Sequence, residues 1–145
     1  MKITFEDICN QLPQLLKDLL SQQKYPLKEL TEGRIKTILN SNKPVAGVYV
    51  ISQNNIPVYV GRSGNLAQRI GTDHRAIQKM QATLGFKLTT LDELPEITTM
   101  REARDYMYKN FCVQIVRIDD DNARAIFEIY ASMQLNTKYN TFREH

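Results

Sequence analysis

Apolar positions along the chain follow two spacings, one typical of helices and one typical of strands. In the first twenty residues they recur every three or four positions, as on one face of an amphipathic helix. Pro13 interrupts this pattern near the first turns. The pattern predicts an amino-terminal helix whose apolar face consists of Phe5, Ile8, Leu12, Leu15, Leu16, Leu19 and Leu20.

Turn-forming residues then separate shorter elements. A turn at Tyr25 and Pro26 leads to a second short helix with Ile35, Ile38 and Leu39 as apolar positions. No linker long enough to divide the chain follows, and 145 residues suffice for one hydrophobic core but not for two independent ones. We therefore expect one globular unit, in which residues 1–43 form a helical extension packed on a body of residues 44–145.

Two runs rich in β-branched and aromatic residues, Val45–Ile51 and Val58–Gly61, predict a hairpin. The length of its loop decides which side chains share a face, because successive residues of a strand point to opposite faces. An odd-numbered loop would place Tyr49 across from Tyr59 on one face, whereas a two-residue loop would separate them. In the first case the other face would carry Val48, Val50, Val58 and Val60.

The second half of the chain predicts three further helices and one strand. Asn65 can cap a helix that turns Leu66, Ile70 and Ile77 inward. The capping-box spacing of Thr99 and Glu102 predicts the start of another helix.

Phe111–Ile118 has the composition of a third strand, and 119–122 should form a turn that caps the last helix. The fold class expected from all elements is α+β, with a small, mainly antiparallel sheet of about three strands flanked by helices. The predicted core stripe of the last helix is Ile126, Ile129, Tyr130 and Met133.

Composition narrows the class of protein. Apolar residues make up 42% and charged residues 24%, as in ordinary folded domains. No apolar stretch approaches the ~20 residues of a membrane-spanning helix, and acids stand where a signal peptide needs bases. Cys9 and Cys112 lack the spacing of a zinc site or a disulfide framework. We expect a cytoplasmic protein without a membrane partner.

The net charge of +3 is too small to indicate a nucleic-acid partner, but its distribution along the chain is uneven. Five basic residues face a single acid between Gly61 and Lys87. They could hold a polyanion or form an ordinary solvated helix face, and charge alone leaves both interpretations open. The five are Arg62, Arg69, Arg75, Lys79 and Lys87.

The hairpin also carries a motif: Gly47-Val48-Tyr49 and then Tyr59-Val60-Gly61, with the two tyrosines ten positions apart. This resembles the double signature of the GIY-YIG nuclease family, with a conservative change at the middle position of each tripeptide. The resemblance extends from Val45 to Asn140, and its specificity comes from the ordered set rather than from either tripeptide. The later matching positions, in order, are Arg62, Arg69, His74, Glu128 and Asn140.

The resemblance implies the GIY-YIG nuclease fold and a DNA endonuclease that hydrolyses a phosphodiester with Mg²⁺ or Mn²⁺. It implies that Tyr49 is the general base and that Tyr59 hydrogen-bonds the scissile phosphate or places the water. Arg69 would neutralise developing negative charge, and Glu128 would hold the metal ion. His74 would share proton handling or bind phosphate.

The remaining candidate residues have supporting roles in this interpretation. Arg62 and Arg75 would contact DNA together with Arg69. Asn140 would brace the carboxy-terminal loop against the site, with Gly47 and Gly61 as further structural positions.

Other functions remain open on sequence alone. A catalytically silent DNA-binding module would use the same scaffold, and a protein-interaction adaptor is a weaker alternative. The leucines of 15–20 suit either a homodimer interface or packing within the chain. The DNA substrate is not indicated, although the first 43 residues and the segment after His74 are available as specificity elements.

Overall fold

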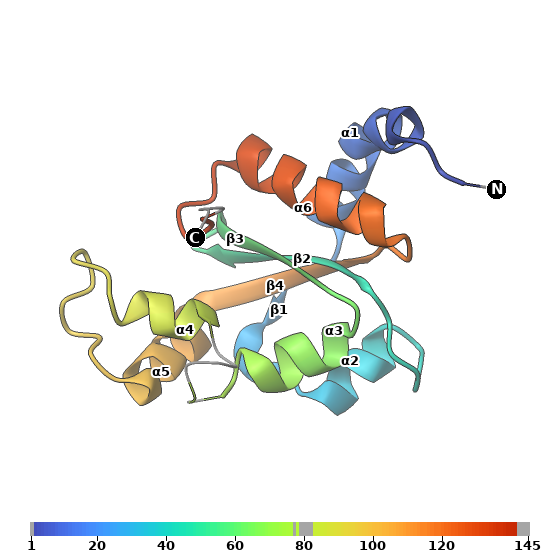
Figure 1. Ribbon diagram of the computed structural model, residues 1–145. Coiled ribbons are helices and arrows are strands. Elements are labelled where there is room, and N and C mark those ends of the chain that lie inside the picture. The colour runs from blue at the N-terminus through green and yellow to red at the C-terminus, as the bar shows by residue number, and fades with distance from the viewer. Residues whose placement is uncertain (1, 77, 79–82, 142–145) are drawn as a thin grey trace.

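The computed structural model describes residues 2–76, 78 and 83–141. In this part of the chain an antiparallel sheet of four strands lies between two layers of helices (Figure 1). The α+β class expected from the sequence is confirmed. The strands lie side by side in the order β1 (Tyr25–Pro26), β4 (Phe111–Arg117), β2 (Gly47–Gln53) and β3 (Ile56–Ser63).

The expected sheet of about three strands is wrong by one strand. Tyr25 and Pro26, predicted as a turn, form the short strand β1 and pair with Val113 and Cys112 of β4. Pro26 fits there because β1 is an edge strand, where one missing N–H does not break a ladder on both sides.

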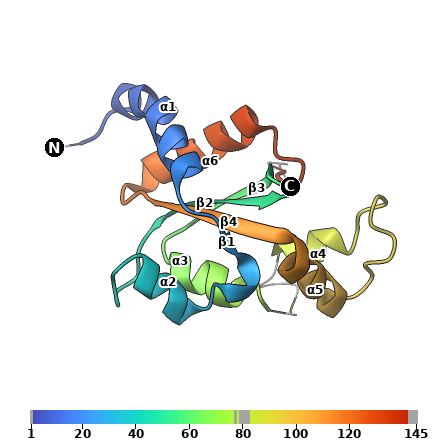
Figure 2. The same cartoon turned by 180° about the vertical axis from the view of Figure 1, so that it is seen from behind.

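One layer of helices covers each face of the sheet (Figures 1 and 2). Helices α1 (Phe5–Ser21) and α6 (Asp121–Leu135) cover one face. Within the described ranges, none of the helices combines the length and the apolar composition of a membrane span. The other face is covered by η1 (Leu27–Glu29), α2 (Glu32–Ile38), α3 (Leu66–Gln68), the π-helix η2 (Arg69–Asp73), α4 (Thr83–Leu88) and α5 (Met100–Asn110).

The first 43 residues contribute to both layers as well as to the sheet. In α1, Leu12 and Leu19 are buried against the sheet and α6, whereas Leu20 is 41% exposed. Leu27 and Ile35 are fully buried in the cluster on the opposite face. Pro13 lies inside α1, which continues to Ser21.

Side-chain caps hold several helix starts as the sequence predicts. Thr99 and Glu102 form both hydrogen bonds of a capping box at α5, and Asn65 caps α3 through the amide of Gln68. Asp120 caps α6 by accepting from the amide of Ala123 at 2.8 Å. Ile77 and Lys79 lie outside the described residues.

The predicted core stripe of α6 is only partly correct. Ile126 and Tyr130 are half-buried, but Ile129 and Met133 are 46% and 73% exposed. The buried stripe is instead Ala123, Phe127 and Ala131, at intervals of four residues. Two alanines let the helix axis approach the sheet closely, and one phenylalanine fills the space between them.

The hairpin of β2 and β3 combines a two-residue turn with a bulge. Asn54 and Asn55 both have positive φ, 53° and 65°, as a tight hairpin turn requires. On its own this turn would place the two tyrosines on opposite faces. The pairing shifts by one residue between Ile51 and Ser52, so that Ile51 pairs with Tyr59 and Tyr49 with Gly61.

The bulge therefore decides which residues meet on each face. Tyr49 and Tyr59 lie diagonally on one face, whereas Val48, Val50 and Val60 pack on the other. The expectation that Val58 joins those three valines is wrong, because Val58 is the extra residue of the bulge and packs in the cluster of Tyr49.

Candidate functional site

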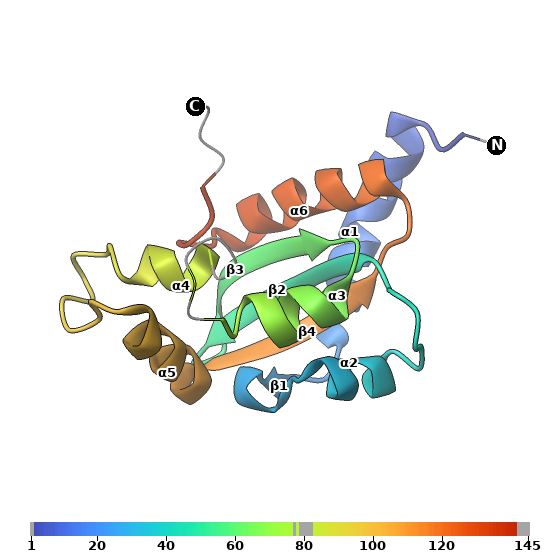
Figure 3. The same ribbon diagram turned by 60° about the horizontal axis from the view of Figure 1, so that its bottom comes forward.

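An open cavity of about 460 Å³ lies at the outer edge of β3. It draws on both layers, because η2 packs on one face of the sheet while α6 packs on the other and runs beside β3 (Figure 3). An edge strand is the place where side chains from the two layers can meet around a sheet. The cavity is lined by Tyr49, Tyr59, Arg62, Ser63, Gly64, Arg69, Arg124 and Glu128.

Tyr49 reaches this cavity from the neighbouring strand by passing over Gly61. The two residues are directly paired across β2 and β3, and Tyr49 is fully buried. A Cβ on Gly61 would collide with the ring and the hydroxyl of Tyr49. The glycine thus provides the gap through which the phenol reaches the sheet edge.

Replacing Gly61 by alanine should displace Tyr49 and destabilise the fold. The buried ring cannot move without disturbing its neighbours, so we expect a loss of about 1–3 kcal/mol in unfolding free energy. Urea denaturation measures this loss, with Gly64→Ala as the control because a Cβ at Gly64 has no atom within 4 Å. Equal stability of the two variants would contradict the proposed gap.

Three rings meet next to the cavity. The centroid of Tyr49 is 6.3 Å from that of Tyr59 and 5.5 Å from that of His74, and Tyr59 and His74 are 5.8 Å apart. The Tyr49 hydroxyl and His74 Nε2 are hydrogen-bonded at 2.5 Å. His74 Nδ1 is buried and has no hydrogen-bond partner within the described part of the chain. His74 itself is 1% exposed and does not line the cavity.

The π-helix η2 presents Arg69 and His74 together. The amide of His74 donates to the carbonyl of Arg69 at 3.0 Å, an i to i+5 bond, which places the two residues one above the other. Gly71 permits this wide turn to pack on α2, because a Cβ there would collide with the backbone of Glu32. The sequence predicts a regular helix at this position, and it does not predict the π-helical hydrogen bond between residues five positions apart.

Arg69 is held on both sides of its guanidinium. Nη2 donates to Thr83 Oγ1 at 2.7 Å, and Nη1 lies 3.7 Å from Asp73 Oδ2. Burial raises the pKa of both tyrosines, that of Tyr49 well above its ordinary value, while Arg69 beside them acts in the opposite direction. Arg69 therefore favours the ionised form of two phenols that burial otherwise keeps protonated.

His74 is neutral at physiological pH. Burial first and the charge of Arg69 second lower the pKa of His74 to about 3. A neutral imidazole has one nitrogen that donates and one that accepts, so Nδ1 and Nε2 take opposite roles, and the tautomer decides which partner donates in the bond with Tyr49.

This buried histidine should make stability depend on pH. The unfolded chain protonates His74 below about pH 6.5, whereas the folded chain does so only near pH 3, so stability falls as pH drops through this window. Between pH 7 and pH 5 the contribution of His74 amounts to about 2 kcal/mol. In a His145→Gln background, the unfolding free energy measured by urea denaturation should decrease less between pH 7 and pH 5 for His74→Gln than for the parent protein. An equal decrease in both proteins would contradict a buried, neutral His74.

Glu128 approaches the cavity from α6, on the far side of the sheet edge. Its Oε1 accepts from Arg62 Nε at 3.2 Å, and its side chain is 15% exposed against 49% for Arg62. Burial raises the pKa of Glu128, although Arg62 acts against this rise. An additional cation bound in the cavity would therefore stabilise the ionised form of this partly buried carboxylate.

Asn140 connects the carboxy-terminal loop to the edge strand. Its amide nitrogen donates to the Val60 carbonyl and its oxygen accepts from the Val60 amide, both at 2.8 Å. Thr137 Oγ1 donates to the same oxygen at 2.6 Å. At the other end of the hairpin, Gly47 makes room for Leu66, since a Cβ there would collide with that side chain and with the Val116 carbonyl.

Arg75 lies apart from the other predicted site residues. Its Nη1 donates to the carbonyls of Leu27 and Lys28, both at 2.9 Å, and its guanidinium lies 4.8 Å from the centre of the Tyr108 ring. Arg75 thus connects the segment after η2 to η1 and does not line the cavity.

Sequence reasoning missed two residues of the site: Arg124, which lines the cavity, and Thr83, which binds Arg69. Arg124 lies one turn before Glu128 and is 8% exposed, and it donates to the carbonyls of Ile118 and Asp119. Its spacing of four residues from Glu128 was the available signal. Thr83, which positions Arg69, follows a segment without a clear pattern and offered no signal.

The donor set suits a hard divalent cation better than zinc. Among the described residues no three His, Cys, Asp or Glu side chains lie close enough together to enclose a metal ion. Glu128 supplies a single carboxylate at the wall of a polar, open cavity. Mg²⁺ or Mn²⁺ fits such a site, because Mg²⁺ commonly binds one or two carboxylates and completes its shell with water and substrate oxygens.

Comparisons with known proteins identify no relative of this chain. No protein-family model, no curated protein and no solved structure matches the chain. The interpretation of the site therefore depends on its own chemistry, that of two phenols, three guanidinium groups and a carboxylate around one cavity, with a buried imidazole bonded to one of the phenols.

Proposed function

We propose that this protein is a metal-dependent DNA endonuclease of the GIY-YIG type that hydrolyses a phosphodiester at the edge of β3. One observation carries the proposal: Tyr49, Tyr59, Arg69 and Glu128 line a single cavity although about eighty positions separate the first from the last. Cleavage of a phosphodiester needs an activated oxygen nucleophile and positive charge around the phosphoryl oxygens. This cavity contains groups suited to both tasks.

Proton transfer in this proposal runs through Tyr49 and His74. Tyr49 accepts a proton from the attacking water and passes its own phenol proton to His74 Nε2, with which it is hydrogen-bonded. The resting proton of His74 is then on Nδ1, so that Nε2 can accept. A bound phosphate favours this transfer, because its negative charge offsets the charge of Arg69, which otherwise opposes protonation of His74.

The other residues act on the phosphate. Arg69 neutralises the developing charge with its planar fork, and Tyr59 donates a hydrogen bond to a phosphoryl oxygen. Arg62, half exposed at the rim, contacts the strand next to the scissile bond. The water oxygen bonds to phosphorus, the bond from phosphorus to O3′ breaks, and O3′ takes a proton from solvent. The products carry 5′-phosphate and 3′-hydroxyl ends.

Glu128 would hold Mg²⁺ or Mn²⁺ in this cavity. When bound, the ion supplies positive charge that stabilises the phosphoryl oxygens in the transition state. A single protein carboxylate implies weak metal binding in the absence of DNA. Arg62 must share Glu128 with the ion, and its half-exposed side chain is free to turn towards the DNA backbone.

Incubation with supercoiled plasmid tests the proposal. We expect Mg²⁺ or Mn²⁺ to support nicking and chelation to abolish it, with duplex, flapped and branched DNA as further substrates and RNA as a control. The competing function is DNA binding without cleavage, which the ion pair of Glu128 with Arg62 favours because it occupies the carboxylate. That function predicts a salt-sensitive mobility shift without product under any metal.

A further inference from the structure

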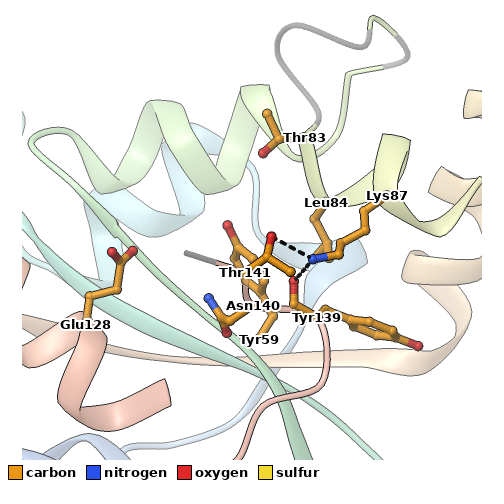
Figure 4. A pocket seen from close by; sticks show the side chains of 8 residues that line it. All are labelled: Tyr59, Thr83, Leu84, Lys87, Glu128, Tyr139, Asn140 and Thr141. Atoms are coloured by element: carbon orange, nitrogen blue, oxygen red, sulfur yellow. Dashed lines mark hydrogen bonds between the residues drawn. The ribbon is translucent and has the colours of Figure 1, made fainter. Parts of the chain in front are cut away.

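A second cavity, of about 300 Å³, lies beside the one described above. The two share Tyr59 and Glu128 as walls, so they follow each other along the edge of β3. Figure 4 shows the second cavity, with Glu128 on one side and Lys87 on the other. Its lining consists of Tyr59, Thr83, Leu84, Lys87, Glu128, Tyr139, Asn140 and Thr141.

Lys87 occupies a fixed position in this cavity. Its ammonium donates to the Tyr139 carbonyl at 2.7 Å and to Thr141 Oγ1 at 3.1 Å (Figure 4). Both of these acceptors are neutral, and they orient the ammonium in the wall of the cavity. An ammonium held in this way is a point charge of the kind that binds a phosphate oxygen.

The segment that carries Lys87 is also tied to the catalytic residues. Thr83 and Lys87 lie one turn apart on α4, and Thr83 receives a hydrogen bond from Arg69. In the carboxy-terminal loop that Lys87 binds, Asn140 is fixed to Val60 of β3, next to Tyr59. A phosphate at Lys87 would therefore have a defined place relative to one bound at Tyr59 and Arg69.

We propose that the cavity of Lys87 is a second phosphate subsite, which binds the phosphate adjacent to the scissile one and aligns the DNA strand along the edge of β3. The inference rests on the proposed function and extends it. Positive charge would then flank the reaction centre on both sides, with Arg62 and Arg124 in the first cavity and Lys87 in the second. A role as a purely structural latch for the carboxy-terminal loop is the alternative that the experiment must separate.

The salt dependence of DNA binding distinguishes a phosphate subsite at Lys87 from a purely structural latch. Fluorescence anisotropy with a labelled DNA duplex is measured in Mg²⁺ in a Tyr49→Phe background, which by the proposed mechanism binds DNA but cleaves it very slowly. Because each phosphate contact adds about 0.9 to the slope of log K against log salt concentration, Lys87→Met should lower the slope by about that amount. Lys87→Arg, which keeps the charge, should retain the slope, as should Thr141→Val, which removes only a latch hydrogen bond.

Each outcome has a distinct meaning. Equal slopes for Lys87→Met and its parent would overturn the subsite while leaving the nuclease proposal intact. An equal loss of affinity in Lys87→Met and Thr141→Val with unchanged slopes would assign Lys87 to the latch and also overturn it. Absence of DNA binding in every protein, together with absence of nicking by the wild type, would overturn the proposed function itself.

Discussion

Tyr49→Phe should lower the rate of DNA cleavage by about 10²- to 10⁴-fold, the range that a general base contributes. The variant keeps the ring and its packing but removes the oxygen that links the cavity to His74. Because Tyr49 acts on the water and not on DNA binding, the affinity for DNA should stay within a few-fold. Single-turnover cleavage and binding, measured separately, give this contrast.

The variant has a structural cost that needs a control. Removal of the hydroxyl leaves His74 Nε2 buried without its partner, which costs about 1–3 kcal/mol of stability. Tyr106→Phe is the matched control, because the Tyr106 hydroxyl also forms a hydrogen bond, with Gln53 at 2.8 Å, but lies away from the cavity. A fully folded Tyr49→Phe protein that cleaves within about tenfold of the wild type would remove Tyr49 from the base role.

Glu128→Gln should have the second large effect, a loss of cleavage on the order of 10³-fold. A neutral amide cannot hold the divalent ion, and charge stabilisation of several kcal/mol in the transition state is lost with it. The ion pair with Arg62 is partly exposed, so stability should change by no more than about 1 kcal/mol. Plasmid nicking at saturating Mg²⁺ measures the effect.

Glu93→Gln provides the comparison for this second variant. Glu93 is 55% exposed and lies 3.9 Å from Lys138, so its replacement removes a carboxylate and a salt bridge outside the catalytic cavity. We expect Glu93→Gln to cleave at the rate of the wild type. Undiminished cleavage by Glu128→Gln would exclude Glu128 as the residue that holds the metal.

The sequence predicted the elements of the hairpin well but not the geometry that joins them. Its strands follow from β-branched runs around a polar turn. Whether Tyr49 and Tyr59 share a face depended on loop length, and the actual turn of two residues alone would have separated them. The bulge at Val58 reverses that outcome, and a bulge has no composition by which it could be foreseen.

Glu128 shows the same limit on the helical side. Its exclusion from the core stripe of α6 could be read from the pattern, although the stripe itself was misplaced towards Ile129 and Met133. The prediction followed the large apolar residues. The helix instead buries Ala123 and Ala131, because small side chains allow close approach to the sheet. The place of Glu128 at an edge strand follows from tertiary packing alone.

His74 and Arg75 illustrate how adjacent residues can differ in what sequence reveals. The motif order singles out His74 and the basic run includes Arg75, but the π-helix turns His74 inward to Tyr49, whereas Arg75 binds the carbonyls of η1. One additional residue in a helical turn rotates every later side chain. A regular helical period therefore cannot assign their directions.

A crystal structure of the Tyr49→Phe protein with Mn²⁺ and a short DNA duplex, with the metal located by anomalous scattering, tests the proposed nuclease site directly. We expect one manganese ion bound by Glu128 and by an oxygen of a single phosphate, with Tyr59 and Arg69 contacting that same phosphate. Manganese or phosphate bound elsewhere, with the cavity at the edge of β3 empty, would exclude this site as the place of cleavage.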